Sequence, residues 1–269
     1  MTVPATREPS SSSSPSSPSS PSSPSGVWLR RYRPVEDPAV RLVCFPHAGG
    51  SATAYLRFAD SLADSGVEVL AVQYPGRQDR RGEPFIKSVD ALAEAVLPEL
   101  GEWTGRPFAL FGHSLGGTLA YETARRLTGS GTEPVHLFVS GRRAPTVPRT
   151  DTAHLLDDRA LISRISALQG TDPALLQDEE LLRMVLPALR NDYGMAGAYR
   201  HRAGAPLSVP LTVLTGDSDP NVSVDDARRW SEVAGGPVDL HVLPGGHFFL
   251  NDRSESVCHI IEEALEHVR

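Results

Sequence analysis

Ser114 lies at the centre of a short pattern that could make its hydroxyl reactive. The pattern G-x-S-x-G is formed by Gly112, His113, Ser114, Leu115 and Gly116. It stands between an apolar run, typical of a strand, and a small-residue segment, typical of a helix. Such a turn lifts the serine above a sheet, and the flanking positions need glycine because a larger side chain would collide. The first amides and the positive dipole end of the helix would face the hydroxyl. The pattern therefore indicates a nucleophile for acyl transfer.

A serine hydroxyl becomes a good nucleophile only when a base takes its proton, and in this architecture the acid and histidine follow the serine in that order. The run "LTVLT" is followed by "GDSDPNV", which contains Asp217 and Asp219, and "VDLHVL" is followed by "PGGHFFL", which contains His247. Asp219 precedes Pro220, which fixes the loop and leaves the carboxylate free to project. We therefore expect Asp219 to orient His247, with Asp217, which could instead form a local turn, as the alternative.

The other histidines do not fit the role of base. His113 flanks the serine and His47 lies in the first loop, and neither follows the acid in the required order. We expect both to pack or to donate and accept hydrogen bonds. The remaining histidines show no paired metal-ligand spacing, so we expect no metal site; they include His201, His241, His259 and His267.

The segment "CFPHAGGSA", residues 44–52, contains two glycines directly after the first long apolar run. These glycines would let the backbone fold back toward the serine. An amide there, together with the amide of Leu115, could stabilise the oxyanion of a tetrahedral intermediate. Ala48 is the expected donor in this loop. The alternative is a generic tight turn with no part in catalysis.

The reactive residues fall between short apolar runs that alternate with longer helical periodicities. This alternation predicts an α/β fold with a mostly parallel sheet flanked by helices. The expected strands are residues 40–45, 67–73, 108–111, 135–140, 211–215 and 238–243. The expected helices are residues 54–65, 88–100, 115–128, 224–234 and a last helix from residue 254.

Residues 151–205 interrupt the alternation with two or three amphipathic helices and no strand. An all-helical insertion between two strands of such a sheet predicts a lid over the strand ends. Ordinary crossover helices are the alternative. Pro187 lies inside the second apolar stripe and should kink or split that helix.

Composition favours one domain and argues against nucleic acid as a partner. The chain has 269 residues, 40% of them hydrophobic and 22% charged, with a formal net charge of -7. One domain over residues 26–269 is expected at this length, and a negative chain is not expected to bind nucleic acid. Cys44 and Cys258 lie in apolar runs without CxxC spacing and are expected to be reduced core residues.

The N-terminal residues 1–25 are a serine and proline run with almost nothing to bury, which predicts a disordered tail. A tether or a phosphorylated segment is the alternative. No apolar stretch approaches the ~18 residues that span a bilayer, and no basic-then-apolar leader precedes the domain. We expect a cytoplasmic protein with no membrane partner.

Seven segments taken together resemble a known family. They are "FPHAGGSA", "YPGRQDR", "GHSLGG", "SGRRAP", "LPALRNDY", "TGDSDP" and "GGHFFL". In this order they are similar to the type II thioesterases that accompany polyketide synthases and nonribosomal peptide synthetases. The resemblance covers residue 27 to the C-terminus. The serine and proline tail departs from the family pattern, and so, mildly, does Leu115 in place of methionine.

The resemblance implies a free-standing α/β-hydrolase that removes stalled or wrong acyl groups from the phosphopantetheine arm of acyl or peptidyl carrier proteins. We expect the protein to be a monomer. The resemblance places the nucleophile on Ser114, the acid on Asp219 and the base on His247, and it requires no cofactor. It also implies that the insertion after residue 151 is a lid that shapes the acyl chamber and admits the arm. A general carboxylesterase, a product-releasing or cyclising thioesterase and a non-catalytic carrier-binding module are the rival interpretations.

Overall fold

The computed structural model describes Met1 and residues 27–148, 152–168 and 178–268. Apart from Met1, the predicted disordered tail lies outside these residues. The described residues form a sheet of seven strands in the order β1-β3-β2-β4-β5-β6-β7, in which only the β1 and β3 pair is antiparallel. The strands are β1 (Leu29–Arg30), β2 (Val40–Phe45), β3 (Val67–Val72), β4 (Phe108–His113), β5 (His136–Ser140), β6 (Leu211–Gly216) and β7 (Val238–Leu243). The predicted α/β class is confirmed.

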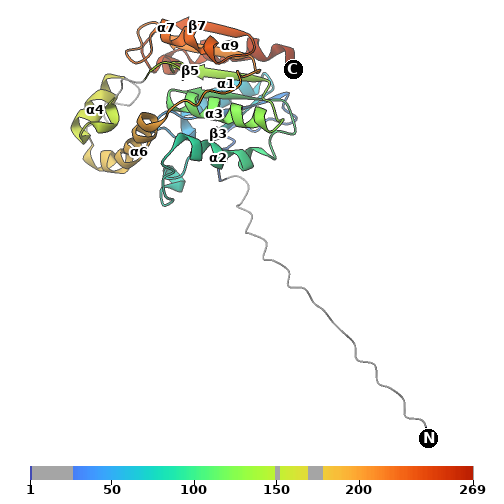
Figure 1. Cartoon of the computed structure of the whole chain (residues 1–269), viewed down its shortest axis with the longest axis horizontal. Coiled ribbons are helices and arrows are strands. Elements are labelled where there is room, and N and C mark those ends of the chain that lie inside the picture. The colour runs from blue at the N-terminus through green and yellow to red at the C-terminus, as the bar shows by residue number, and fades with distance from the viewer. Residues whose placement is uncertain (2–26, 149–151, 169–177, 269) are drawn as a thin grey trace.

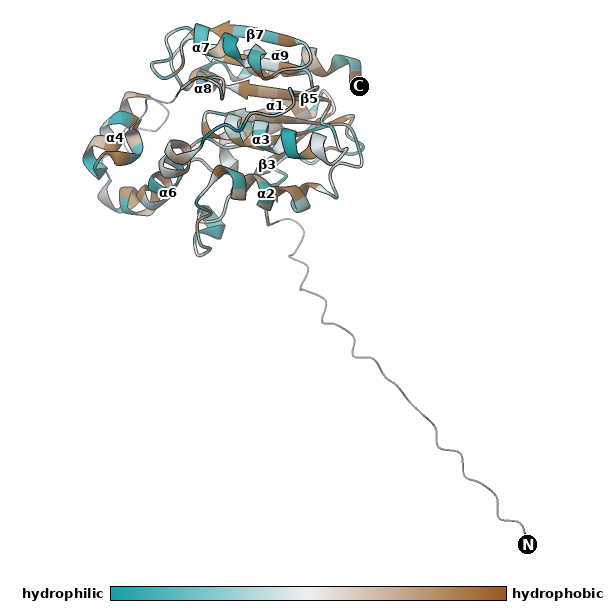
Figure 2. Cartoon of the chain, in the orientation of Figure 1, coloured by the Kyte–Doolittle hydropathy of each residue, from teal (hydrophilic) through white to brown (hydrophobic). Residues whose placement is uncertain are grey.

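The central strands are buried on both faces, as parallel strands between two helical layers must be. Along β2, Val43 and Phe45 belong to one hydrophobic cluster, whereas Leu42 and Cys44 belong to the cluster on the other face. Figure 2 shows the hydrophobic colour concentrated on the strands inside the molecule, with mixed colours on the helices. The alternation along each strand thus builds two cores, one on each side of the sheet.

Helices cover both faces of the sheet (Figure 1). Leucine and valine side chains of α2 and α3 pack into one core, while those of α1 and α9 pack into the other. The helices are α1 (Leu56–Ala63), α2 (Val89–Leu100), α3 (Leu115–Gly129), α4 (Asp158–Ala167), α6 (Glu179–Ala198), α7 (Val224–Arg228), α8 (Phe249–Asp252) and α9 (Ser254–Leu265). None of them has the length and apolarity that a membrane crossing needs, within the described residues.

Most of the sequence-based elements agree with these bounds to within a few residues. Strand β1 is missing from the expectation because two residues carry no readable alternation. Helix α7 is shorter than expected, since the chain tightens into a 3₁₀ turn at Arg229–Glu232. Both cysteines are free and buried, as predicted.

Between β5 and β6 the described residues contain helices and no named strand, and α4 with the first half of α6 stands out from the rest of the molecule in Figure 1. The prediction that Pro187 splits its helix is wrong, because α6 runs through it unbroken. Proline removes the hydrogen bond to the carbonyl four residues earlier. Here Pro187 is exposed, so this loss falls on the water-facing side of α6.

A buried histidine in β5 predicts a loss of stability in acid. His136 is 5% exposed, its Nε2 lies 2.8 Å from Thr212 Oγ1, and burial lowers the pKa of its imidazole to about 4. The unfolded chain, with a histidine pKa near ~6.5, therefore binds more protons than the folded chain between about pH 6.5 and 4. Stability should fall as pH decreases through this window, by about 1–2 kcal/mol between pH 7 and pH 5 for this residue.

Urea unfolding at both pH values measures this effect. In His136→Gln the free energy of unfolding should fall less on acidification than in the wild type, whereas His259→Gln, at an exposed position, should leave the fall unchanged. An equal fall of the free energy of unfolding in wild type and His136→Gln would contradict the lowered pKa of His136 as its cause.

Candidate active site

Ser114 occupies a strained turn between β4 and α3. Its backbone has φ 55 and ψ -115, a conformation that costs free energy for any residue other than glycine. A Cβ built on Gly112 would lie 2.0 Å from the carbonyl oxygen of Gly116, and one built on Gly116 would lie 1.9 Å from that of Phe45. The predicted steric need for both glycines is confirmed. The surrounding backbone therefore holds the serine in the strained conformation.

The structure brings Ser114, His247 and Asp219 together from three strand ends. His247 Nε2 lies 3.0 Å from Ser114 Oγ, and His247 Nδ1 lies 2.8 Å from Asp219 Oδ2. The Asp219 side chain is fully buried and that of His247 is 5% exposed. Because parallel strands present their carboxyl ends at one edge, the loops after β4, β6 and β7 meet there.

Asp217 and Asp219 make different contacts although only two residues separate them. Asp219 accepts a hydrogen bond from the backbone N–H of Asn221 at 2.8 Å through Oδ1, which leaves Oδ2 toward His247. Asp217 accepts from the backbone N–H of Gly245 at 3.0 Å, within the turn between β7 and His247. Asp217 thus bonds the loop that carries His247 rather than His247 itself.

Two further histidines pack beside His247 without reaching Ser114 by a hydrogen bond. His113 Nδ1 lies 3.0 Å from Ser140 Oγ, and its ring centroid lies 5.1 Å from that of His247. Burial lowers the pKa of His113 well below its usual value, and it lowers the pKa of His47 to about 4. Both rings are therefore neutral near pH 7 and add no charge beside His247.

The expected oxyanion donors border the serine. Ala48, Ser114, Leu115 and His247 line one small cavity of about 50 Å³. Leu115 is the first residue of α3, where backbone N–H groups have no partner within the helix. Ala48 lies in the loop after β2, the strand beside β4. The two residues expected to supply these amides therefore border the serine, one from the loop after β2 and one from the start of α3.

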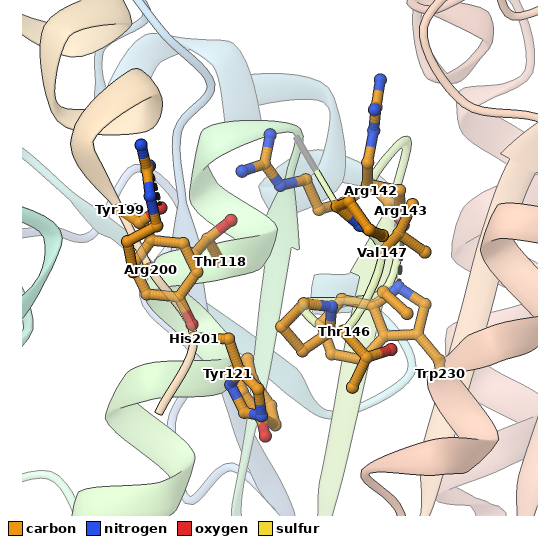
Figure 3. Close-up of a pocket in the computed structure, with 13 residues that line it drawn as sticks. Thr118, Tyr121, Arg142, Arg143, Thr146, Val147, Tyr199, Arg200, His201 and Trp230 are labelled. Carbon is orange, nitrogen blue, oxygen red and sulfur yellow. Dashed lines mark hydrogen bonds between the residues drawn. The ribbon is translucent and has the colours of Figure 1, made fainter. Parts of the chain in front are cut away.

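Two larger cavities adjoin this small one on different sides. An apolar cavity of about 210 Å³ shares Ala48, Leu168 and Tyr193 with it and extends along α6 past Leu181, Val185 and Leu189. Another, of about 300 Å³, shares Arg142 and Arg143 with it. Figure 3 shows the second one, with Arg142, Arg143 and Arg200 toward one side and the rings of Tyr121, His201 and Trp230 toward the other. The cavities differ in the chemistry they can accept.

Sequence reasoning missed two charged features of this region. Arg142 and Arg143 were noticed only inside the motif "SGRRAP", with no role attached. Asp192 and Arg77 form a buried ion pair, with Arg77 Nη2 lying 2.6 Å from each carboxylate oxygen. The sequence gives no signal for this pair, since polar residues flank both and 115 residues separate them along the chain. Among the described residues, no three histidine, cysteine or acidic side chains are grouped so as to hold a metal.

The geometry is suited to acyl transfer through the serine. An imidazole at hydrogen-bond distance from a hydroxyl can take its proton, and a buried carboxylate on the other ring nitrogen fixes the tautomer and stabilises the imidazolium. Backbone amides near the serine can bind a developing oxyanion. A serine, acid and histidine in this order, on the strand ends of such a sheet, define the α/β-hydrolase class.

Comparison with known proteins narrows the class to a family. The Thioesterase domain family model matches residues 40–265, and the chain belongs to this family. Thioesterase PikA5 of Streptomyces venezuelae is 50% identical over 244 residues, which are 90% of this chain and 86% of that protein. Gramicidin S biosynthesis protein GrsT of Aneurinibacillus migulanus is 36% identical over 213 residues, 78% of this chain and 83% of that protein.

A solved structure agrees with these sequence relatives. The type II thioesterase BorB from the borrelidin biosynthetic cluster superposes with a TM-score of 0.84 and 48% identity, over 91% of this chain and 100% of that one. The resemblance to type II thioesterases of polyketide and nonribosomal peptide pathways is thus confirmed. The chain is a thioesterase of the α/β-hydrolase class.

Proposed function

We propose that this thioesterase removes stalled or wrong acyl groups from the phosphopantetheine arm of acyl or peptidyl carrier proteins. Ser114 Oγ attacks the thioester carbonyl while His247 takes the hydroxyl proton, and the amides of Ala48 and Leu115 bind the oxyanion. The C–S bond then breaks and His247 returns the proton to the departing thiolate. Water, activated by His247, next attacks the acyl-serine ester, which releases a carboxylic acid and restores Ser114. Asp219 holds His247 throughout.

One observation carries the proposal: the small cavity at Ser114 adjoins an apolar cavity without charged residues and a second cavity that contains three arginines. An acylated phosphopantetheine arm is apolar at its acyl end and anionic at its phosphate end, with the thioester between them. The apolar cavity under α4 and α6 suits the acyl chain, since half of its lining residues are leucine, isoleucine or valine. The cavity lined by Arg142, Arg143 and Arg200 suits the phosphate.

The distance along α3 is compatible with an extended arm. Thr118 and Tyr121 lie four and seven residues after Ser114, on one face of the helix and about 6 and 10 Å along its axis.

Arg143 donates one hydrogen bond, from Nη2 to the Asn221 carbonyl at 2.6 Å. A guanidinium has five donors, so others could bind a phosphate. In this proposal α4 and α6 serve as the lid over the acyl end.

Release of acyl groups from loaded carriers tests the function. A panel of carrier proteins bearing short, branched and extended acyl chains is incubated with the enzyme, and the intact mass of each carrier is followed. We expect conversion of the acyl carriers to the free thiol form, with rates that depend on the acyl chain. Carriers that stay acylated across the panel, while a small activated ester is hydrolysed, would contradict a carrier substrate.

The cationic cavity leads to a separate prediction. In Arg142→Gln/Arg143→Gln, kcat/KM for an acyl-phosphopantetheine thioester should fall by about 10-fold, as expected for losing a hydrogen bond to a charged group. For the same acyl group on pantetheine, which lacks the phosphate, kcat/KM should change by less than about twofold. Steady-state hydrolysis of the two thioesters measures the difference.

Arg57→Gln is the matched control, because Arg57 is an exposed arginine on α1, against the opposite face of the sheet, and bonds the Asn251 carbonyl. It should leave both substrates unaffected. An equal loss on both substrates in the double variant would mean that the arginines act on the fold or on the serine site rather than on the phosphate.

A further inference from the structure

The loop that carries Ala48 is held at several points by other parts of the chain. Tyr55 donates from its hydroxyl to the Phe45 carbonyl at 2.6 Å, and Tyr74 donates to the Pro46 carbonyl at 3.1 Å. The N–H of Gly49 donates to Asp192 Oδ2 at 2.8 Å. The tyrosines belong to the body of the domain, whereas Asp192 belongs to α6. Helix α6 therefore holds the amide directly beside Ala48.

Asp192 is fixed in a fully buried site. Its side chain has no exposed surface, and that of its partner Arg77 is 5% exposed. Burial raises the pKa of Asp192, against the opposing effects of Arg77 and of the Gly49 N–H. Asn191, the preceding residue, donates to the Ile86 carbonyl at 2.9 Å. The segments that contain Gly49, Arg77 and Ile86 thus all bond α6 at Asn191 and Asp192.

Leu189 adds a packing contact to the same place. Gly49 has φ +75, and a Cβ built there would lie 2.3 Å from Leu189 Cδ2. Leu189 and Asp192 are three residues apart and share one face of α6. One residue of the loop is therefore packed against the helix and hydrogen-bonded to it, so that a shift of α6 must move Gly49 and the adjacent amide of Ala48.

We infer that Asp192 is a positioning residue, which sets the Ala48 amide for the oxyanion by holding the Gly49 N–H from α6. The inference rests on the proposed function for the role of Ala48. Helix α6 then has two roles. It covers the acyl cavity, and it also positions the donor for the carbonyl oxygen. An acyl chain that fits under α6 would then react faster than one that displaces it.

The expected kinetic effect lies on the chemical step. An oxyanion donor acts only when it lies at hydrogen-bond distance from the developing charge, and complete loss of one donor lowers kcat by about 10²–10³-fold. Loss of the Asp192 carboxylate frees the donor to move rather than removing it. We therefore expect kcat of Asp192→Ala to fall by about 10- to 100-fold, with KM changed by less than about threefold.

Glu68 offers a matched control, because it is another fully buried carboxylate with arginine partners and a backbone donor. It pairs with Arg31 and Arg41 and accepts from the N–H of Val35 at 3.3 Å. It lies at the amino end of β3, whereas Ser114 follows the carboxyl end of β4. Glu68→Ala should lower the melting temperature while kcat per folded molecule stays at the wild-type value.

The test measures kcat and KM of wild type, Asp192→Ala, Asp192→Asn and Glu68→Ala on a small activated ester, which needs no carrier, and on an acyl carrier. Asparagine keeps an acceptor for the Gly49 N–H, so Asp192→Asn should lose less kcat than Asp192→Ala and remains usable if alanine prevents folding. The serine hydroxyl adds to the carbonyl of a trifluoromethyl ketone and forms a bound oxyanion. The affinity of this ketone for Asp192→Ala should therefore fall by the same factor as kcat.

Wild-type kcat per folded molecule in both Asp192 variants would overturn the inference. So would an equal loss of kcat in Glu68→Ala, or unchanged trifluoromethyl ketone affinity in Asp192→Ala. Failure of the proposed function gives a different result, since the wild type would then hydrolyse the activated ester but not discharge the carrier. The comparison of variants on the ester still decides the role of Asp192 in that case.

Discussion

Ser114→Ala should abolish discharge of acyl carriers, with kcat reduced by about 10⁴-fold or more. The reason is that the proposed mechanism passes through an ester on Ser114 Oγ, and no other hydroxyl lies at hydrogen-bond distance from His247 Nε2 among the contacts of the described residues. Any residual rate would come from the oxyanion donors and from binding alone. The intact mass of the carrier over time measures the loss.

Folding of Ser114→Ala has to be checked separately. Alanine meets the same strain at φ 55 as serine does, so the melting temperature should stay close to that of the wild type. An acyl adduct mapped by peptide mass to Ser114 in the wild type, and absent from the variant, would identify the nucleophile. Retained discharge by pure, folded Ser114→Ala would contradict the assignment of Ser114.

Asp219→Asn should lower kcat by about 10⁴-fold, whereas Asp217→Asn should lower it by less than about threefold. The amide can donate to His247 Nδ1 and so favours the tautomer with its proton on Nε2, which cannot take a proton from Ser114. It also removes the buried charge that stabilises the imidazolium. Asp217 accepts from the Gly245 N–H and interacts with Ser218, so its loss should leave His247 in place.

Comparison of the two variants is informative because the residues are neighbours with similar chemistry. Steady-state rates on one acyl carrier, with melting temperatures for both proteins, are sufficient. A larger loss in Asp217→Asn than in Asp219→Asn would transfer the orienting role to the other carboxylate.

Local chemistry explains why so much of the site was predictable from sequence. A buried parallel strand is a short apolar run, and the elbow at Ser114 needs glycines at fixed spacing. The acid and histidine follow two further apolar runs, so chain order alone placed them at one edge of the sheet. Pro220, directly after Asp219, fixes the loop there, and this favoured Asp219 over Asp217 as the orienting acid.

Features that depend on long-range packing were not predictable in the same way. The contact of Asp192 with Gly49 spans 143 residues, and nothing in either segment names its partner. The cavities require the relative placement of α6, α3 and the loop after β5. Pro187 shows the reverse error: the local rule allowed a split of the helix, but α6 continues through the proline, which is exposed.

The most direct measurement compares one acyl group presented as a carrier-bound thioester and as a matched oxygen ester. The account predicts a clearly higher kcat/KM for the carrier thioester, because the thiolate leaves more readily and the arginine-lined cavity receives the phosphate of the arm. It also predicts that both activities disappear in Ser114→Ala. A clearly higher kcat/KM for the oxygen ester would contradict the proposal that carrier-bound thioesters are the substrate.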